Sequence, residues 1–100
     1  MITITHHNNT ITVKGHAGYA PHGQDIVCAS ISALLQVFVA SVEELSGDKL
    51  KCEIRAGNAV ISYKELSEKS RTLLSSFFIG CRMIANAYPQ YVRIVQALTT

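Results

Sequence analysis

The chain has 100 residues, of which 48% are hydrophobic and 16% charged, and its formal net charge is +2. This length predicts one domain over residues 1–100. The Lys and Arg residues are scattered and form no basic run, so the sequence does not support direct nucleic-acid binding, although weak binding to ribosomal surfaces stays open. With so few charged residues, part of the apolar surface needs to be covered by a partner. We therefore expect a homodimer. The three widely spaced cysteines, Cys28, Cys52 and Cys81, argue against a disulfide framework and are typical of the cytoplasm.

The first half of the chain predicts a hairpin, a loop and a long helix. Apolar and polar residues alternate over residues 1–6 and 10–15, as in a β-hairpin. Residues 15–24 hold three glycines and a proline and are expected to form a loop. Asp25 then caps a helix over residues 26–42, which contains no charged side chain. Serines and a glutamine interrupt this run, so we expect a central helix packed on several sides and no membrane partner.

A second hairpin follows. Leu50, Cys52 and Ile54 alternate with charged residues, which predicts a half-buried strand. Gly57 and Asn58 form the turn, and residues 59–63 return. The pattern makes Cys52 a residue of the core.

The last part of the chain predicts a helix and a short strand. Ser62 and Glu65 have capping-box spacing for a helix that Pro89 ends. The apolar residues of this helix recur at helical intervals, and Cys81 is expected in the core. Residues 91–95 form the closing strand. The order β-β-α-β-β-α-β predicts an α+β fold, a compact sandwich of one small β-sheet packed with two helices.

The candidate catalytic residues lie around the loop before the first helix. A cysteine attacks as its thiolate, and a helix start favours that anion, so Cys28 in the first helical turn is a candidate nucleophile. His16 ends the preceding strand, and the loop can fold back to bring it to the sulfur as an acid/base partner. Free amides near Cys28 can bind an oxyanion. Each residue alone is more often structural, a small buried cysteine and a loop histidine.

Other interpretations of these residues remain open. His22 is a rival base or an exposed loop residue. A zinc site at His16, His22 and Cys28 lacks the short paired-ligand spacing, so neither metal nor cofactor is expected. A thiol redox protein would need a resolving cysteine. The adjacent His6 and His7 are expected on the surface, on opposite faces of a strand.

The motif resembles that of a known family. Gly15-His16-Ala17, then Gly23-x-Asp25-Ile26-Val27-Cys28-Ala29-x-x-Ser32, is similar to the signature of the Prp ribosomal-processing cysteine proteases, as is the closing Tyr88-Pro89-x-Tyr91-Val92. The resemblance implies a homodimer in which Cys28 is the nucleophile and His16 the general base. It also implies that Asp25 caps and orients the site and that Gly15 and Ser32 lie at the substrate cleft.

The same resemblance implies a flexible loop and a substrate. The loop orders over substrate and comprises Ala17, Gly18, Tyr19, Ala20, Pro21, His22, Gly23 and Gln24. The substrate is the N-terminal extension of the bacterial large-subunit ribosomal protein L-twenty-seven, cut after Phe, and we expect it to pair with the strand edge near Gly15. The alternatives are a phage-type homologue that processes capsid or scaffold protein and a catalytically silent dimeric binding module. Pro21-His22 departs from the family pattern.

Overall fold

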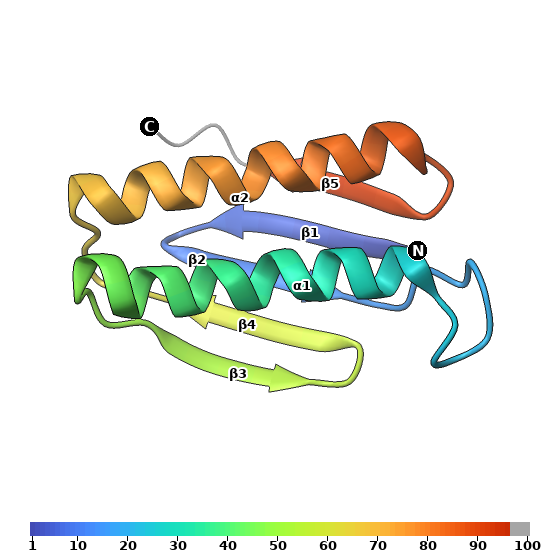
Figure 1. Ribbon diagram of the computed structural model, residues 1–100, viewed down its shortest axis with the longest axis horizontal. Helices are drawn as coiled ribbons and strands as arrows, with labels where there is room; N and C mark the ends of the chain where they lie inside the picture. The colour runs from blue at the N-terminus through green and yellow to red at the C-terminus, as the bar shows by residue number, and fades with distance from the viewer. Residues whose placement is uncertain (97–100) are drawn as a thin grey trace.

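A computed structural model describes residues 1–96, and residues 97–100 lie outside the described part. It contains the strands and helices β1 (Ile2–His7), β2 (Thr10–Lys14), α1 (Ile26–Ser41), β3 (Lys51–Arg55), β4 (Asn58–Ser62), α2 (Glu68–Ala87) and β5 (Val92–Gln96). The strands form one sheet in the order β3-β4-β2-β1-β5, and both helices cover the same face (Figure 1). The predicted α+β sandwich of one sheet and two helices is confirmed.

The sheet is built around the first hairpin. Asn8 and Asn9 both have positive φ, 49° and 58°, which matches the right-handed twist of two strands joined by a two-residue turn. β1 pairs antiparallel with β2 and parallel with β5, while β2 also pairs antiparallel with β4. β2 therefore has a neighbour on each side, and the free edges belong to β3 and β5.

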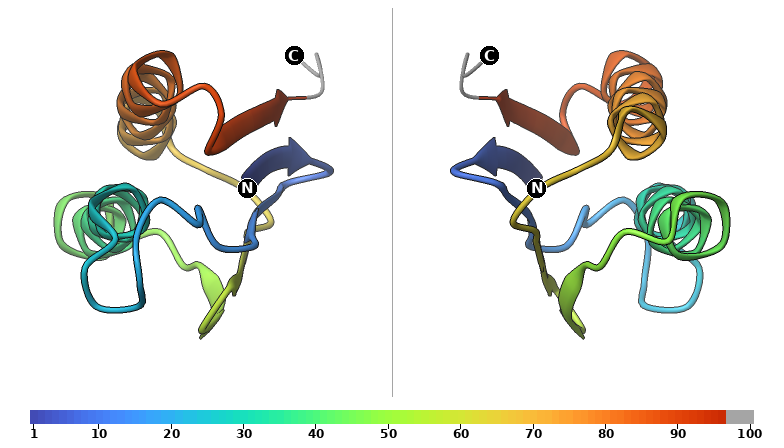
Figure 2. Two further views of the ribbon diagram at one scale, coloured as in Figure 1. Left: turned by 90° about the vertical axis from the view of Figure 1, so that its right-hand side faces the viewer. Right: turned by 90° about the vertical axis from the view of Figure 1, so that its left-hand side faces the viewer.

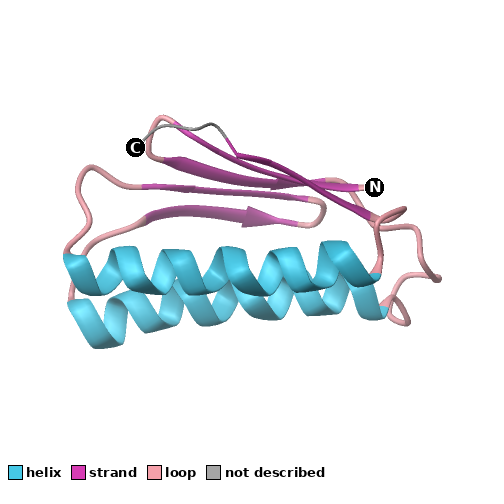
Figure 3. Ribbon diagram, turned by 90° about the horizontal axis from the view of Figure 1, so that it is seen from above, coloured by secondary structure: helices cyan, strands magenta, loops and turns pink. Residues whose placement is uncertain are grey.

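Helix α1 packs against the sheet and, along one flank, against α2. Asp25 caps it as predicted, and Val27, Ile31, Leu35 and Phe38 face the core. The expectation of packing on several sides is confirmed for the sheet and for α2, whereas the outer side of the helix layer has nothing beyond it (Figures 2 and 3). Val37, on the outer side, is 63% exposed.

The end of α1 is also set locally. The helix continues into a π-helical turn, η1 (Val42–Ser46), and stops at Gly47, whose φ of 76° suits glycine. The stretch Ile26–Ser46 is long and apolar enough to cross a membrane by length and composition. This property alone is weak evidence, since a helix with one face in a protein core passes the same test.

Helix α2 starts later than the sequence predicts. Its N-cap is Ser67, whose hydroxyl accepts a hydrogen bond from the Ser70 amide, while its own amide and hydroxyl donate to Asp48. The capping box at Ser62 and Glu65 is therefore wrong. Ser62 belongs to β4, where its place in the sheet outweighs the local capping signal.

Strand β3 is more exposed than its alternating pattern predicts. All five of its residues are exposed, and Ile54 retains 52% of its surface. The prediction of a half-buried strand with Cys52 in the core is wrong, because β3 is an edge strand that lies beyond the cover of the helices (Figure 2). Cys81 is buried as predicted, and desolvation raises its pKa to about 12.

The two adjacent histidines differ in burial. His7 is exposed as expected, but His6 is half-buried, which corrects the surface assignment. The His6 Nε2 atom shares a 2.7 Å hydrogen bond with the Tyr63 hydroxyl, and the ring stacks on Phe78 at 5.5 Å. Burial lowers the pKa of His6. The β1 pattern could not show this, because the cover comes from Tyr63, just after β4, and from Phe78 in α2.

The centre of the core yields a stability prediction. Phe77 is 3% exposed and contacts the rings of Phe38 and Phe78 at 5.5 and 5.2 Å between centroids. We expect Phe77→Ala to lower the free energy of unfolding by about 3–5 kcal/mol in urea titrations, because it removes a buried ring and leaves a cavity. Met83→Ala, at a 66% exposed position of α2, is the control. Equal losses in both variants would contradict this packing.

Candidate active site

The end of β2 and the start of α1 meet at Cys28. The backbone N–H of Ala17 donates a hydrogen bond to the Cys28 Sγ atom over 3.2 Å. The chain therefore folds back as expected, and the residue after His16 touches the sulfur. Cys28 is half-buried and His16 is exposed. A thiol in this position is open to a peptide on one side and held by the protein on the other.

The imidazole of His16 rests on the turn between β3 and β4. A Cβ atom on Gly57 would lie 2.6 Å from the His16 Nε2 atom, so any larger residue would displace the ring. Gly57 has a φ of +71°, and its carbonyl accepts a 2.9 Å hydrogen bond from the Gly15 amide. Sequence reasoning identified Gly57 only as a turn residue. Its support of His16 depends on the pairing of β2 with β4.

Gly15 is required by close packing beside the site. Its φ is +95°, and a Cβ atom there would collide with the backbone carbonyl of Met1. The amino group of Met1 donates a 2.7 Å hydrogen bond to the carbonyl of His16. The start of β1 therefore fixes the backbone of His16 and leaves its side chain to face the cleft.

Asp25 joins the loop to the helix. One carboxylate oxygen accepts the amides of Val27 and Cys28, each at 3.0 Å, and the other accepts those of Tyr19 and Ala20 at 3.0 and 3.4 Å. These hydrogen bonds, that of Cys28 first, lower the pKa of Asp25. The capping and orienting role thus has a geometric basis. The Cys28 amide, however, is already used and is not the free oxyanion donor that the sequence suggested.

In addition to Asp25, contacts between aromatic rings hold the loop in place. The ring of Tyr19 meets Tyr88 and Tyr91 edge-on, with centroid distances of 5.4 and 5.3 Å. Such T-shaped pairs are favourable beyond their buried area. The segment around Tyr88 and Tyr91, noted in the sequence only for its resemblance, therefore anchors the loop over residues 17–24.

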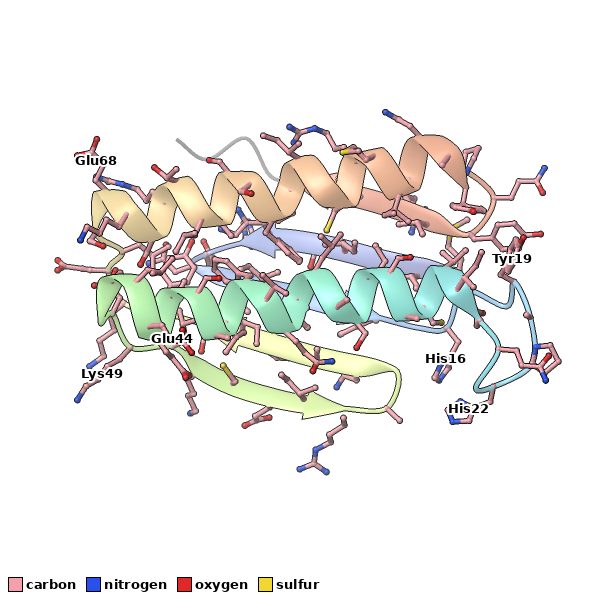
Figure 4. The ribbon with its side chains drawn as sticks, viewed as in Figure 1. His16, Tyr19, His22, Glu44, Lys49 and Glu68 are labelled. Carbon is pink, nitrogen blue, oxygen red and sulfur yellow. The ribbon has the colours of Figure 1, made fainter. Side chains whose placement is uncertain are left out.

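These elements enclose one cleft of about 580 Å³. Predicted site residues that line it are Gly15, His16, Gly18, Ala20, His22, Gly23, Asp25, Cys28 and Ser32. Ala17 is buried, and Tyr19 lies near the end of α2, away from His16 and His22 (Figure 4). His16 and His22 both lie to the right of the β3–β4 turn in this view. Within residues 1–96, no three His, Cys, Asp or Glu side chains gather as a metal ion requires.

The opposite wall of the cleft was not foreseen. It is formed by the end of β3, the turn and the start of β4, namely Ile54, Arg55, Ala56, Gly57, Asn58 and Ala59. The strand edge near Gly15, expected to pair with substrate, is not free. β2 is bordered by β1 and β4, and the Gly15 amide already donates to Gly57. That expectation is wrong, since strand order cannot be read from alternation alone.

The cleft, with its cysteine and histidine, agrees with the family comparison. A family model described as the cysteine protease Prp matches residues 1–93. The chain belongs to this family. It is 32% identical over 98 residues to the ribosomal processing cysteine protease Prp of Mycoplasma genitalium, covering 94% of each protein. It is 29% identical over 99 residues to that of Mycoplasma pneumoniae, covering 91% of this chain and 88% of the relative.

A solved structure shows the same fold. The ribosomal processing protease Prp from S. aureus, in complex with a covalently linked product peptide, superposes with a TM-score of 0.89 at 24% sequence identity. The match covers 97% of this chain and 100% of that one. The protein is thus a cysteine protease of the ribosomal processing Prp family.

The four hydrogen bonds to Asp25 give a pH prediction. Its pKa lies below the ordinary 3.8, so the charged carboxylate stabilises the fold above that value, and this stabilisation is lost as pH falls through the lowered pKa. We expect Asp25→Asn to lower the melting temperature at pH 7, with the difference from the parent shrinking below about pH 4. Ser32→Ala, also in the cleft, is the control. A difference that is independent of pH would contradict this account.

Proposed function

We propose that this enzyme removes the N-terminal extension of the bacterial large-subunit ribosomal protein L-twenty-seven in the cytoplasm, cutting after Phe. Cys28 is the nucleophile and His16 the general base. The observation that carries this assignment is the 3.2 Å contact between the Ala17 amide and the Cys28 sulfur, which places the His16 end of β2 beside the thiol. The names of the two Mycoplasma relatives, which specify ribosomal processing, support the choice of substrate.

The reaction proceeds through a thioester. His16 takes the Cys28 proton, and the sulfur attacks the carbonyl carbon of the peptide bond. His16 then gives that proton to the leaving amine as the C–N bond breaks. A water molecule, deprotonated by His16, attacks the thioester and releases the acid and the thiol. The family resemblance and the geometry of the two chain segments support these roles.

The oxyanion needs a donor that Asp25 does not occupy. The amides of Val27 and Cys28 donate to that carboxylate, whereas the Ala17 amide points at the sulfur. We assign the oxyanion to Ala17, because its N–H is already directed at the atom to which the carbonyl carbon becomes bonded. Asp25 supports this arrangement by holding the next part of the loop at Tyr19 and Ala20.

The cleft suits an aromatic residue beside the scissile bond. Its apolar lining includes Ile2, Val13, Ile31, Leu35 and Ile54. Burying a ring against such side chains is worth several kcal/mol at the usual ~25 cal/mol per Å². This supports a preference for Phe at the cut. The loop over residues 17–24 then acts as the segment that opens for substrate when the contacts of Tyr19 with Tyr88 and Tyr91 break.

We infer that the enzyme is a homodimer joined through α1. Ile26, Ala33, Val37 and Ala40 recur on the outer side of this helix, and all four are exposed. The helix carries no charged side chain to solvate that side. An uncharged exposed stripe of this kind is typical of a surface covered by a partner. A second copy of the chain can cover this stripe, so that no other protein is required.

Cleavage of a peptide spanning the ribosomal extension tests the dyad and the substrate together. Mass spectrometry should show one cut after Phe, none in Cys28→Ala or Cys28→Ser, and none in a peptide lacking the Phe. His16→Ala should lower kcat by roughly 10²–10⁴. His22→Ala is the matched comparison, because His22 also lines the cleft. A loss of kcat in His22→Ala alone would transfer the base assignment to His22.

If the ribosomal peptide is not cleaved, two further results distinguish the possible reasons. If phage capsid or scaffold peptides are cut by the same dyad, the mechanism holds and the ribosomal substrate is wrong. If no peptide is cut and Cys28 does not react with iodoacetamide, the chemistry assigned to Cys28 is wrong.

The dimer is tested by light scattering at micromolar concentration. The parent should have twice the monomer mass, and Val37→Glu should be monomeric because it places a charge in the buried stripe. Met83→Glu, at an equally exposed position of α2, should remain dimeric. A monomeric parent protein would overturn the dimer.

A further inference from the structure

The sheet has one unpaired edge that leads into the cleft. β3 pairs only with β4, so the other side of its backbone has no strand beside it. The end of β3 lines the cleft through Ile54 and Arg55. The other edge strand, β5, contributes none of the described lining residues. A peptide that extends from the cleft along the sheet therefore meets β3.

The face of β3 beside this edge is apolar and open. Cys52 pairs with Ile61 and Ile54 with Ala59, and paired residues point to the same side of a sheet. Ile61 and Ala59 are buried under the helices, so Cys52 and Ile54 point toward the helix layer as well. Both are nevertheless exposed, because that layer does not reach β3. We call Cys52 and Ile54 the β3 shelf.

One flank of α1 follows the shelf along its length. Cys28 and Ser32 stand one turn apart and line the cleft opposite Ile54. Further along, Glu43 in η1 is close enough to Cys52 that its carboxylate adds to the effect of desolvation, the larger cause, in raising the pKa of that thiol. The β3 shelf therefore lies between this flank of α1 and the free edge of the sheet. Ile54 is at the end near Cys28, and Cys52 is at the end near Glu43.

We propose that an extended segment of the substrate, flanking the scissile bond, pairs with the free edge of β3 and places apolar side chains on the β3 shelf. This deepens the proposed function and rests on it. Backbone pairing provides affinity, and the alternate side chains provide specificity. The five residues of β3 span about 17 Å, so roughly five substrate residues are engaged in addition to the one at the cut.

The opposite face of β3 explains why the edge stays available. Lys51, Glu53 and Arg55 alternate with the shelf residues and are exposed. Charged residues on an edge strand oppose indiscriminate pairing with other chains. An extended apolar peptide that is already held in the cleft overcomes this barrier, because its pairing is then intramolecular.

Alkylation of Cys52 tests occupancy without catalysis. In Cys28→Ala, Cys52 is the one exposed thiol, since the only other cysteine is the buried Cys81. A saturating peptide that the parent enzyme cuts should slow its labelling by maleimide about fivefold or more, as backbone pairing shields an edge. The control is Cys28→Ala with Cys52→Ser and Val95→Cys, which moves the thiol to β5, where Val95 is 49% exposed. Its labelling should not change.

An N-methyl scan of the same peptide tests strand pairing directly. Methylation of every second amide should weaken binding to Cys28→Ala by about tenfold or more, and the amides between should tolerate it, because only alternate N–H groups face the neighbouring strand. Cys52→Asp should raise the KM of the parent for long peptides by about tenfold and have less effect on peptides shortened to the cleft, because Cys52 belongs to the β3 shelf and not to the cleft lining. Val95→Asp is the matched control.

The outcomes separate this proposal from the substrate assignment. If the ribosomal peptide is not cut, a peptide selected by cleavage from a mixed library replaces it, and the β3 test proceeds unchanged. A peptide that is cut but neither protects Cys52 nor shows the alternating pattern overturns edge pairing and leaves the protease assignment intact. Protection that appears without peptide and grows with protein concentration assigns the edge to a second copy and also overturns the proposal.

Discussion

The site depends on one carboxylate that satisfies backbone groups from two segments. The start of a helix leaves amides without partners, and Asp25 accepts two of them while also accepting two from the loop. Helix α1 and the loop over residues 17–24 are therefore fixed relative to each other. Because Ala17 lies at the start of this loop, its amide reaches the Cys28 sulfur. A single acceptor thus determines both where Cys28 stands and which amide remains directed at its sulfur.

Strand order determines the rest of the cleft. Placing β4 beside β2 brings the β3–β4 turn under His16, where only a glycine leaves space for the ring. The same order puts β2 in the interior of the sheet and β3 at its edge. His16 therefore follows a strand that cannot accept a peptide, while the neighbouring hairpin offers an edge that can. Support of the reacting groups and pairing with substrate are divided between two adjacent hairpins.

The local features were predictable from the sequence because their signals are local. Asp25 before an uncharged run marks the helix start, Gly47 its end, and Asn8-Asn9 the first turn. The approach of the segment after His16 to Cys28, seen in the hydrogen bond from Ala17, followed from a strand end and a helix start joined by one loop. The predictions failed where contacts between segments distant in the sequence determine the structure. Ser62 has the spacing of a cap but is held in β4, and Cys52 alternates like a core residue but lies at an edge. Alternation shows which side chains share a face and not whether anything covers that face.

The two uncovered apolar surfaces have different physical meaning. The outer side of α1 is a convex helical stripe with no free backbone groups, so only its side chains can be satisfied, and a second helix suits it. The β3 shelf lies beside an unpaired strand, where an occupant must also satisfy backbone N–H and C=O groups, and an extended chain suits it. Because the shelf opens into the cleft that holds Cys28 and the helical stripe faces away from the sheet, the proposed partner on the stripe and the proposed substrate on the shelf do not compete for the same surface.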